Sequence, residues 1–207
     1  KKRFSDHFTL FGNYTYSKAF NTTTDFNSDF GPEDNTNLAA ERALSDFDER
    51  HKIVVAGVFE SPWRQRFLSG FQLSPIVSYH SGLPFNLLTG SDVNGDRHYT
   101  NDRPIGAPRN TGLGPNFVQF DSRLGWRWKF TERYSVMLTA EAFNLFNRTN
   151  YASVNNIVDP NFALPAPQGL GQTTFNVHGF TGNPSSPLAF TSDFPKREFQ
   201  LGARFDF

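Results

Sequence analysis

The closing stretch of the chain, KREFQLGARFDF at residues 196–207, alternates apolar and polar side chains without a break. Successive side chains of a β-strand point to opposite faces of the sheet, so one face of this segment is apolar and the other is polar. The apolar positions are Phe199, Leu201, Ala203, Phe205 and Phe207. The pattern predicts a long strand whose apolar face meets membrane lipid or, alternatively, the core of a soluble β-sandwich.

The composition fits strands with aromatic ends and long polar loops. The 207 residues include 24 Phe, six Tyr and three Trp, yet the mean hydropathy is negative. The longest apolar run, residues 53–59, is far shorter than the ~20 residues that a transmembrane helix needs. A membrane-crossing helix is therefore excluded, whereas transmembrane strands remain open because only every second residue of such a strand is apolar.

Charge and cysteine content exclude several classes of function. The chain has 20 basic and 20 acidic residues, so no overall field favours nucleic acid as a partner. Without cysteine it has no disulfide, no thiol nucleophile and no cysteine-bound metal. The histidines show no paired spacing, and Gly-Leu-Gly at 112–114 and 169–171 lacks the rest of a phosphate-binding loop. We therefore expect no enzyme and no cofactor, and we interpret both glycine pairs as loop residues.

Six segments have the alternation expected of strands: residues 4–17, 51–59, 71–80, 118–130, 133–145 and 196–207. Segment 51–59 has apolar residues at both odd and even positions, so the pattern leaves open which set points to the apolar face of the sheet. Pro75 is unusual inside a central strand. Residues 140–147 also fit a short helix, but the alternation that begins at Tyr134 favours a strand.

The connections between these segments alternate in length. Residues 18–50, 81–117 and 146–195 are long connections, whereas 60–70 and 131–132 are short. In an antiparallel sheet every long connection then falls at one end of the strands. Bacterial outer-membrane barrels have this asymmetry, with short periplasmic turns and long extracellular loops, and a soluble sandwich has no reason for it.

Aromatic residues gather near the two ends of the predicted strands. Tyr and Trp favour membrane interfaces because the ring is apolar while its OH or NH group stays near water. We predict an outer and a periplasmic girdle, formed respectively by Tyr14, Tyr16 and Tyr79 and by Trp126, Trp128 and Tyr134.

The sequence thus predicts an all-β fold: a segment of an antiparallel transmembrane β-barrel, with about six strands in three hairpins and long external loops, in the outer membrane of a Gram-negative bacterium. Single-chain bacterial barrels have at least about eight strands, so six cannot close one. The chain begins with a basic turn at residues 1–3 and without a signal segment. We therefore expect the last three hairpins of a larger barrel, shortened by truncation or processing.

Several motifs occur in an order that is similar to one family. They are AEAFNLFNRTNY at 140–151, DERH at 48–51, SGLPF at 81–85, NGD at 94–96 and NDRP at 101–104. Together with the closing strand they resemble the C-terminal part of TonB-dependent outer-membrane receptors, and most of all the Oar-like branch. The similarity covers nearly the whole chain.

The resemblance implies a barrel of about 22 strands that holds an N-terminal plug domain and is energised through TonB. Residues 1–207 would be the C-terminal portion of that barrel, without the plug. The implied function is TonB-dependent uptake or export of an unknown substrate. The alternative is a passive pore, or a structural or adhesive outer-membrane protein without energy coupling. The implied partners are outer-membrane lipid and lipopolysaccharide, the plug domain, the TonB system and the barrel-assembly machinery.

Two sets of residues in the strands have expected roles. The resemblance implies that the closing strand, with the five apolar residues named above, is the signal read by the barrel-assembly machinery. On the opposite face, polar side chains are predicted to face the lumen, where we expect them to pair across strands or to contact the plug. These residues are Asp121, Arg123, Arg127, Lys129, Glu141, Glu198 and Arg204.

Two loop segments concentrate acidic side chains. Asp92, Asn94 and Asp96, with Asp102 beyond, resemble the start of a calcium loop, but the bidentate Glu that completes such a loop is missing. The favoured alternative is a set of Asx turns, so we expect no metal there. Residues 18–50 carry eight acidic and three basic side chains. These either attract a cationic or metal-bearing ligand or form a solvated surface that divalent ions bridge to lipopolysaccharide, and we favour the surface.

Overall fold

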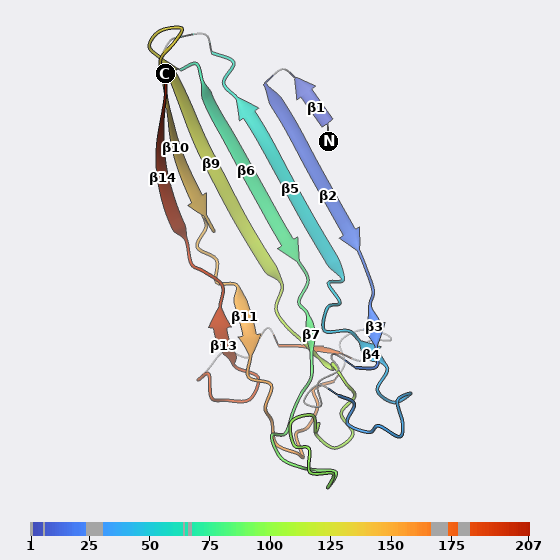
Figure 1. Ribbon diagram of the computed structural model, residues 1–207. Helices are drawn as coiled ribbons and strands as arrows, with labels where there is room; N and C mark the ends of the chain where they lie inside the picture. Colours follow the sequence, from blue (N-terminus) through green and yellow to red (C-terminus); the bar gives the residue numbers. More distant parts are fainter. Residues whose placement is uncertain are drawn as a thin grey trace.

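The computed structural model describes residues 2–5, 7–23, 31–63, 65, 68–166, 174–177 and 183–207. Its main element is a seven-stranded antiparallel sheet in the order β1-β2-β5-β6-β9-β10-β14 (Figure 1). The strands are β1 Lys2–Ser5, β2 Phe8–Tyr16, β5 His51–Glu60, β6 Phe71–His80, β9 Phe117–Lys129, β10 Ser135–Phe143 and β14 Glu198–Asp206. The predicted all-β antiparallel fold is confirmed. In the described part of the chain, no helix has the length and apolar character needed to cross a membrane.

The main sheet is open rather than closed. β1 and β14 are its two edge strands, and each pairs with one neighbour only. An open sheet of this kind is consistent with an incomplete barrel, as predicted from the strand count.

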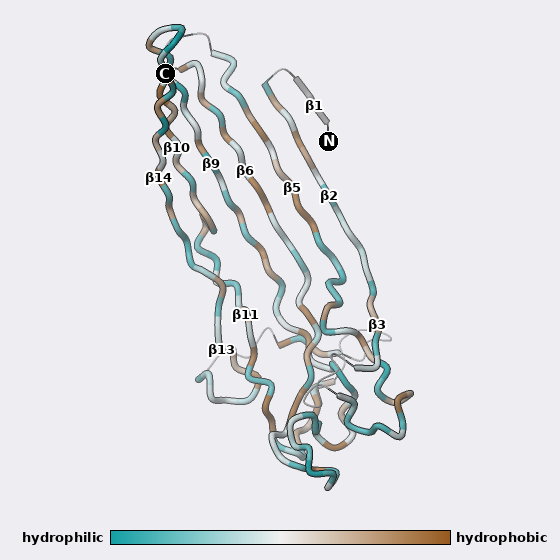
Figure 2. Tube along the Cα trace, in the orientation of Figure 1, coloured by the Kyte–Doolittle hydropathy of each residue, from teal (hydrophilic) through white to brown (hydrophobic). Residues whose placement is uncertain are grey.

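The register of the sheet places the apolar positions on one face. One row of paired residues runs across six strands and is apolar throughout: Phe8, Phe59, Leu73, Leu124, Ala140 and Leu201. The next position along each strand points to the other face, where Arg123 pairs with Glu141 and Glu141 with Gln200. Figure 2 shows the alternation along the strands. The register also shows which residues of β5 point to each face: its odd-numbered residues lie on the apolar face.

The first predicted strand was wrong in one respect. Residues 4–17 do not form one strand, because the chain reverses between Ser5 and Phe8 and β1 folds back on β2. The alternation did not reveal the turn because Phe4 and Phe8 are both at even positions, so the apolar–polar pattern continues across it. Lys2 and Arg3 lie in β1 instead of in a basic turn, and the sheet has seven strands instead of six.

The other predicted strands agree with the structure to within two residues at each end. β6 has the predicted bounds and contains Pro75, opposite which β5 carries Gly57. A Cβ on Gly57 would lie 3.6 Å from the Pro75 ring, which is an ordinary van der Waals distance, so the proline does not require a glycine beside it. The helix considered for 140–147 does not form, because β10 continues to Phe143 and Asn144 then adopts a positive φ of 48°.

The long connections all lie at one end of the sheet and the short ones at the other, as predicted (Figure 1). Residues 17–50, 81–116 and 144–197 form the long ones, and 61–70 and 130–134 the short ones.

The described parts of the long connections fold together into what we call the loop platform. It contains three small sheets. The first pairs β3 Phe20–Asn21 with β4 Ala43–Leu44, and the second joins β7 Pro84–Phe85, β8 Gly112–Leu113 and β12 Phe175–Asn176. The third pairs β11 Tyr151–Val154 with β13 Phe190–Asp193. Gly112 was predicted to be a loop residue and lies instead in β8, where a Cβ would meet the Phe85 ring at 2.4 Å. The second glycine pair, 169–171, lies outside the described residues.

The buried apolar side chains of the described residues lie in the loop platform. The cluster consists of Leu87, Val158, Phe175, Val177 and Leu188. Among the described side chains of the main sheet there is no such core on either face, and the apolar face carries large exposed side chains. The platform can therefore exclude water by itself, whereas the sheet needs another apolar medium to cover it.

Candidate functional site: sheet faces, loop platform and mouth pocket

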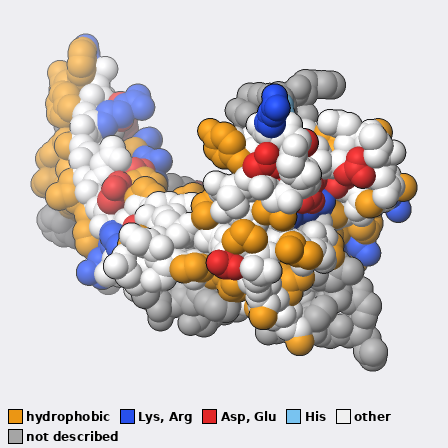
Figure 3. All heavy atoms as spheres, turned by 90° about the horizontal axis from the view of Figure 1, so that it is seen from below, with side chains coloured by type: hydrophobic (Ala, Val, Ile, Leu, Met, Phe, Trp, Pro, Cys, Tyr) orange, Lys and Arg blue, Asp and Glu red, His pale blue; other side chains and the backbone are white. Residues whose placement is uncertain are grey.

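The seven polar residues predicted to face the lumen all lie on the polar face of the main sheet. Arg123 Nε is 3.3 Å from Glu141 Oε1 on the neighbouring strand, which is the cross-strand pairing that the sequence suggested. Asp121 accepts hydrogen bonds from Gln119 Nε2 at 2.9 Å and from the Asn144 amide at 2.8 Å. Figure 3 shows Lys, Arg, Asp and Glu on the side of the strand wall that faces the loops, and hydrophobic side chains on the other side.

The remaining predicted lumen residues are less constrained. Arg204 pairs with Asp206 on its own strand at 2.7 Å, and Arg127 Nη2 lies 3.7 Å from the Met137 sulfur. Lys129 and Glu198 make no ion pair with any described residue. The predicted cross-strand ion-pair scaffold thus amounts to one pair among these residues. That their face is the lumen stays a prediction.

The polar face also carries an apolar patch that sequence reasoning missed. Phe11 of β2 is paired with Ala56 of β5, which is paired with Ile76 of β6, and all three point to the polar face. Val54 and Val58 flank Ala56 on the same face. Phe11 is 45% exposed and Ile76 is 41% exposed. We call these five residues the inner apolar patch. It was hidden because residues 51–59 are apolar on both parities.

Aromatic side chains gather at the short-turn end of the apolar face. Trp126 stacks on Phe71 with centroids 5.7 Å apart and on Trp128 at 5.9 Å, while Tyr134 stacks on Phe205 at 6.1 Å. This is where the periplasmic girdle was predicted. Between this girdle and mid-strand, Leu124, Leu138 and Leu201 line a shallow apolar groove of about 480 Å³, a shape that suits lipid chains.

The aromatic residues at the loop end of the apolar face are Tyr14, Tyr16 and Tyr79. The Tyr14 hydroxyl is 2.9 Å from Nδ1 of His51, and the Tyr16 ring lies 5.4 Å from the same imidazole. Phe146, which the sequence did not single out, packs on Phe120 at 5.0 Å. These positions suit an outer girdle, and its contact with lipid head groups stays a prediction.

The predicted insertion signal lies on the edge strand β14. All five of its residues are exposed, including Leu201 at 83% and Phe207 at 84%. Their apolar side chains continue the apolar face, while the outer backbone edge of β14 pairs with no described strand. A strand with a free edge and an apolar face is suited to recognition by strand addition.

We expect Phe207→Ala to lower the amount of assembled protein in the outer membrane severalfold, because it removes the terminal aromatic of this strand. Ligand affinity per assembled barrel should stay unchanged. Heat-modifiable gel migration of outer-membrane fractions measures assembly. The control is Phe146→Ala, an exposed aromatic on the same face but outside the strand. Normal assembly of the Phe207 variant would contradict the assignment.

A buried ion-pair cluster joins two loops of the platform. The Arg103 guanidinium donates to both carboxylate oxygens of Glu41 at 2.7 and 2.6 Å, and its Nη2 lies 2.6 Å from Glu33. The Arg103 backbone NH also donates to Glu33 at 3.2 Å. Glu41 is 2% exposed and Arg103 is 7% exposed. The cluster therefore fastens residues 31–50 to the segment around Arg103.

Burial and charge act in opposite directions in this cluster. Burial raises the pKa of the Glu33 carboxyl, and the nearby Arg103 charge only partly offsets it. Burial alone would lower the pKa of Arg103, but the hydrogen bonds that it donates to Glu41 and the charges of Glu33 and Glu41 outweigh this effect, so the pKa is raised. The guanidinium stays protonated at any physiological pH.

A second buried arginine joins the same two connections. Arg109 Nη1 donates to the Asn21 carbonyl at 3.2 Å, and Nη2 lies 3.4 Å from Asp46. Burial lowers the pKa of Arg109, although the Asp46 charge opposes the shift. Asn110 donates from its amide to the Leu44 carbonyl at 2.7 Å.

Several acidic side chains of the connection 18–50 are thus paired with arginines, two of which belong to the connection 81–116. Besides Glu33, Glu41 and Asp46, the buried Asp48 pairs with Arg50 at 2.8 Å and accepts a hydrogen bond from the Ala19 amide at 2.7 Å. Asp34 of the same connection is exposed, and the two predicted roles of this connection, a cation-attracting loop or a solvated surface, stay predictions. Asp25 and Asp29 lie outside the described residues.

The segment 92–96 forms Asx turns. Asp92 accepts hydrogen bonds from the Gly95 and Arg97 amides at 2.6 and 3.0 Å, and Asn94 Oδ1 accepts from Asp96 at 2.8 Å. Asp102 accepts from the Val93 and Asn94 amides. In the described part of the chain, no group of three or more His, Asp or Glu side chains is placed to hold a metal ion. The hydrogen bonds of this segment are those of Asx turns, the alternative that the sequence favoured, and calcium binding is not tested by them.

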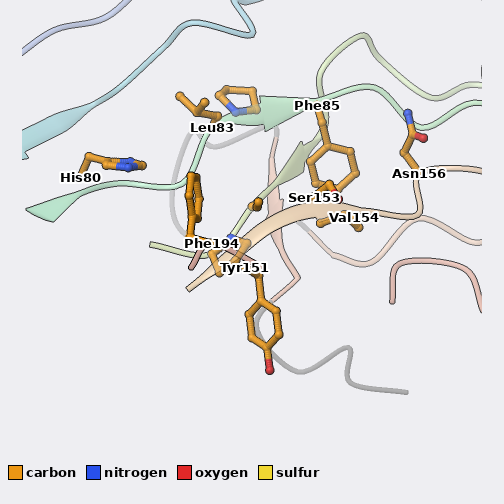
Figure 4. A pocket seen from close by; sticks show the side chains of 12 residues that line it. His80, Leu83, Phe85, Tyr151, Ser153, Val154, Asn156 and Phe194 are labelled. Atoms are coloured by element: carbon orange, nitrogen blue, oxygen red, sulfur yellow. The ribbon is translucent and has the colours of Figure 1, made fainter. Parts of the chain in front are cut away.

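A pocket of about 330 Å³ lies where the loop end of the main sheet meets the platform (Figure 4). We call it the mouth pocket. His80 ends β6 on the polar face, stacks on Phe117 at 4.8 Å, and Phe117 meets Phe194 edge-on at 5.1 Å. Figure 4 shows the Phe85 ring of β7 directed toward Ser153 and Val154 of β11. Sequence reasoning missed this pocket because its walls come from the end of β6 and from two connections that are distant in the sequence.

The walls of the mouth pocket are held by a close backbone approach. Gly82 donates to the Asn116 side chain at 3.0 Å, and the Gly114 amide donates to the Leu83 carbonyl at 3.0 Å. A Cβ on Gly82 would lie 1.7 Å from the Gly114 carbonyl oxygen, so only glycine allows the two segments to meet.

The chain matches the family model described as "Outer membrane beta barrel domain" over residues 1–112 and 104–181. No curated protein and no solved structure matches it. The match covers most of the chain, and the open antiparallel sheet with one apolar face and one polar face has the features of such a domain. The chain belongs to the outer membrane beta barrel domain family.

Proposed function

We propose that this chain is the C-terminal barrel portion of a TonB-dependent receptor, of the kind that its motifs resemble. The protein is located in the bacterial outer membrane. In this proposal β2 to β14 are wall strands, the loop platform faces the outside, and a substrate passes through the barrel when a plug is remodelled. The role is that of a receptor and transporter without catalytic chemistry of its own.

The observation that carries the proposal is the inner apolar patch. The lumen of a water-filled pore is lined by polar side chains, because water is the only material that contacts them. Phe11 and Ile76 instead present large apolar surfaces on the polar face, with Val54, Ala56 and Val58 between and beside them. Apolar side chains in this position are stable when another protein surface packs on them. A plug domain supplies such a surface, and a passive pore or an adhesive barrel does not.

The partners follow from the same arrangement. Outer-membrane lipid and lipopolysaccharide would cover the apolar face, and the plug would lie against the polar face. The TonB system would act through the plug, and the barrel-assembly machinery would recognise β14.

Cysteine labelling tests whether the inner apolar patch is covered. Residues 1–207 contain no cysteine, so Ile76→Cys gives a single reporter within this part of the intact outer-membrane protein, and the protein without the substitution gives the background labelling. We expect a membrane-impermeant maleimide to label this variant at least about tenfold more slowly than Tyr99→Cys, whose parent side chain is exposed on the platform. Gel-shift labelling of whole cells measures both rates.

Two outcomes would count against the receptor. Equal labelling of the two variants would mean that water fills the lumen beside Ile76, as in a passive pore. Full protection with substrate uptake that persists after collapse of the proton-motive force would mean that the barrel is filled but not energy-coupled.

A further inference from the structure

We propose that the mouth pocket binds an uncharged aromatic ring of a small molecule at the entrance of the barrel. The inference rests on the proposed receptor function, because it takes the polar face to be the inner wall. His80 belongs to that face and lies at its loop end. A ligand held beside it is at the passage between the platform and the lumen.

The pocket presents ring surfaces that are fixed before a ligand arrives. Phe194 is held edge-on by Phe117, and Phe117 is stacked on His80 with the two ring planes only 8° apart. Phe85 closes the opposite side, and β7 is fixed by its pairing with β8. Aromatic rings attract one another in edge-to-face and offset-stacked arrangements, so a guest ring gains contacts with little ordering cost.

The charge of the lining selects an uncharged guest. Among the described residues that line the pocket none is Asp, Glu, Lys or Arg. The lining includes Tyr151 and His80, and His80 Nδ1 lies 3.9 Å from the carboxylate of Glu49 outside the pocket. An ionised ligand would lose water here without gaining a counter-charge. The neighbouring ion pairs of the platform point to one another rather than into the pocket.

The size and the polar groups narrow the class further. A volume of about 330 Å³ is at the lower end of the ~300–1,000 Å³ typical of small-molecule sites, so it holds one or two rings. Ser153 and Asn156 are the hydroxyl and amide side chains of the lining. The Ser153 hydroxyl already contacts the Thr191 hydroxyl at 2.6 Å, and Asn156 Nδ2 donates to the Asn86 carbonyl at 2.9 Å. The Asn156 side-chain oxygen can accept a hydrogen bond from a hydroxyl substituent on the ring.

Calorimetric titration of the intact protein in nanodiscs tests the inference with three soluble probes. These are 4-nitrophenyl β-glucoside, an uncharged aryl compound; methyl β-glucoside, which lacks the ring; and 4-nitrophenyl sulfate, which has the ring and a charge. We expect the aryl glucoside to bind about tenfold more tightly than either of the others. Phe194→Ala should weaken it by about the same factor, and Phe146→Ala should not change it.

Each other outcome overturns the inference in a specific way. Equal binding of methyl glucoside would make the pocket a sugar site, and equal binding of the sulfate would show that charge is accepted. No binding of the aryl glucoside, or no effect of Phe194→Ala, would remove the pocket as a ring site. Phe194→Leu keeps an apolar side chain without the ring and separates ring contact from folding. Maleimide protection at Ile76 is measured apart from this titration, so the receptor and the ligand class can fail independently.

Discussion

Arg103→Ala is expected to cost the loop platform about 3–5 kcal/mol of stability, because it leaves the buried Glu41 carboxylate without its counter-ion. Glu41 is almost fully buried and takes both of its charge-assisted hydrogen bonds from Arg103. Glu33 loses the same partner. Two connections that are separated in the sequence would come apart at this point. Hydrogen–deuterium exchange of peptides from 31–50 and 81–116 measures the loss as faster exchange.

Arg42→Ala is the matched control, since Arg42 is adjacent to Glu41 but exposed and lies over the Phe20 ring. Its effect should stay within about 0.5 kcal/mol. Exchange in β9 should be unchanged in both variants, because the main sheet does not depend on the cluster. If Arg103→Ala and Arg42→Ala accelerate exchange equally, the buried cluster is not what holds the platform together.

Leu124→Arg is expected to destabilise the assembled barrel by about 2–4 kcal/mol, the cost of a cation on the lipid face near the bilayer midplane. Leu124 is exposed near the middle of β9, in the apolar row that runs from Phe8 to Leu201. The temperature at which the folded band disappears on semi-native gels should fall clearly.

Gln119→Arg on the same strand is the control for Leu124→Arg. Gln119 points to the polar face and contacts Asp121 at 2.9 Å, so an arginine there gains a counter-charge. This variant should keep wild-type stability. An equal loss of stability in both variants would contradict the assignment of the two faces. It would show that the two faces do not differ in their surroundings, one in lipid and the other in water.

The main sheet could be read from the sequence because strand alternation is a local pattern. β9 and β14 carry it without interruption, and their bounds differ from the prediction by one or two residues. The same local rule failed at Ser5, where the pattern continued through a turn. The Asx turns at 92–96 were available as an alternative for the same reason, since each bond spans only two to five residues.

The candidate sites were harder to predict because they depend on distant residues. Arg103 and Glu41 are 62 residues apart, and Arg109 and Asn21 are 88 apart. Nothing near either arginine in the sequence marks its partner. The mouth pocket likewise needs β7, β11 and the segment after β13 together. The inner apolar patch could not be predicted without the strands that pair with β5. Because β5 is apolar at both odd and even positions, its own sequence does not show which residues point to the polar face.

The placement of the apolar core has a consequence for how the protein responds to its surroundings. The platform is stabilised by water exclusion around Leu87 and Phe175, so its stability varies with temperature and solutes as that of a small water-soluble domain does. The sheet is stabilised by hydrocarbon on one face, so bilayer thickness and lipid composition govern it instead. A cell that remodels its membrane lipids would alter the stability of the strand wall while leaving that of the loop platform unchanged.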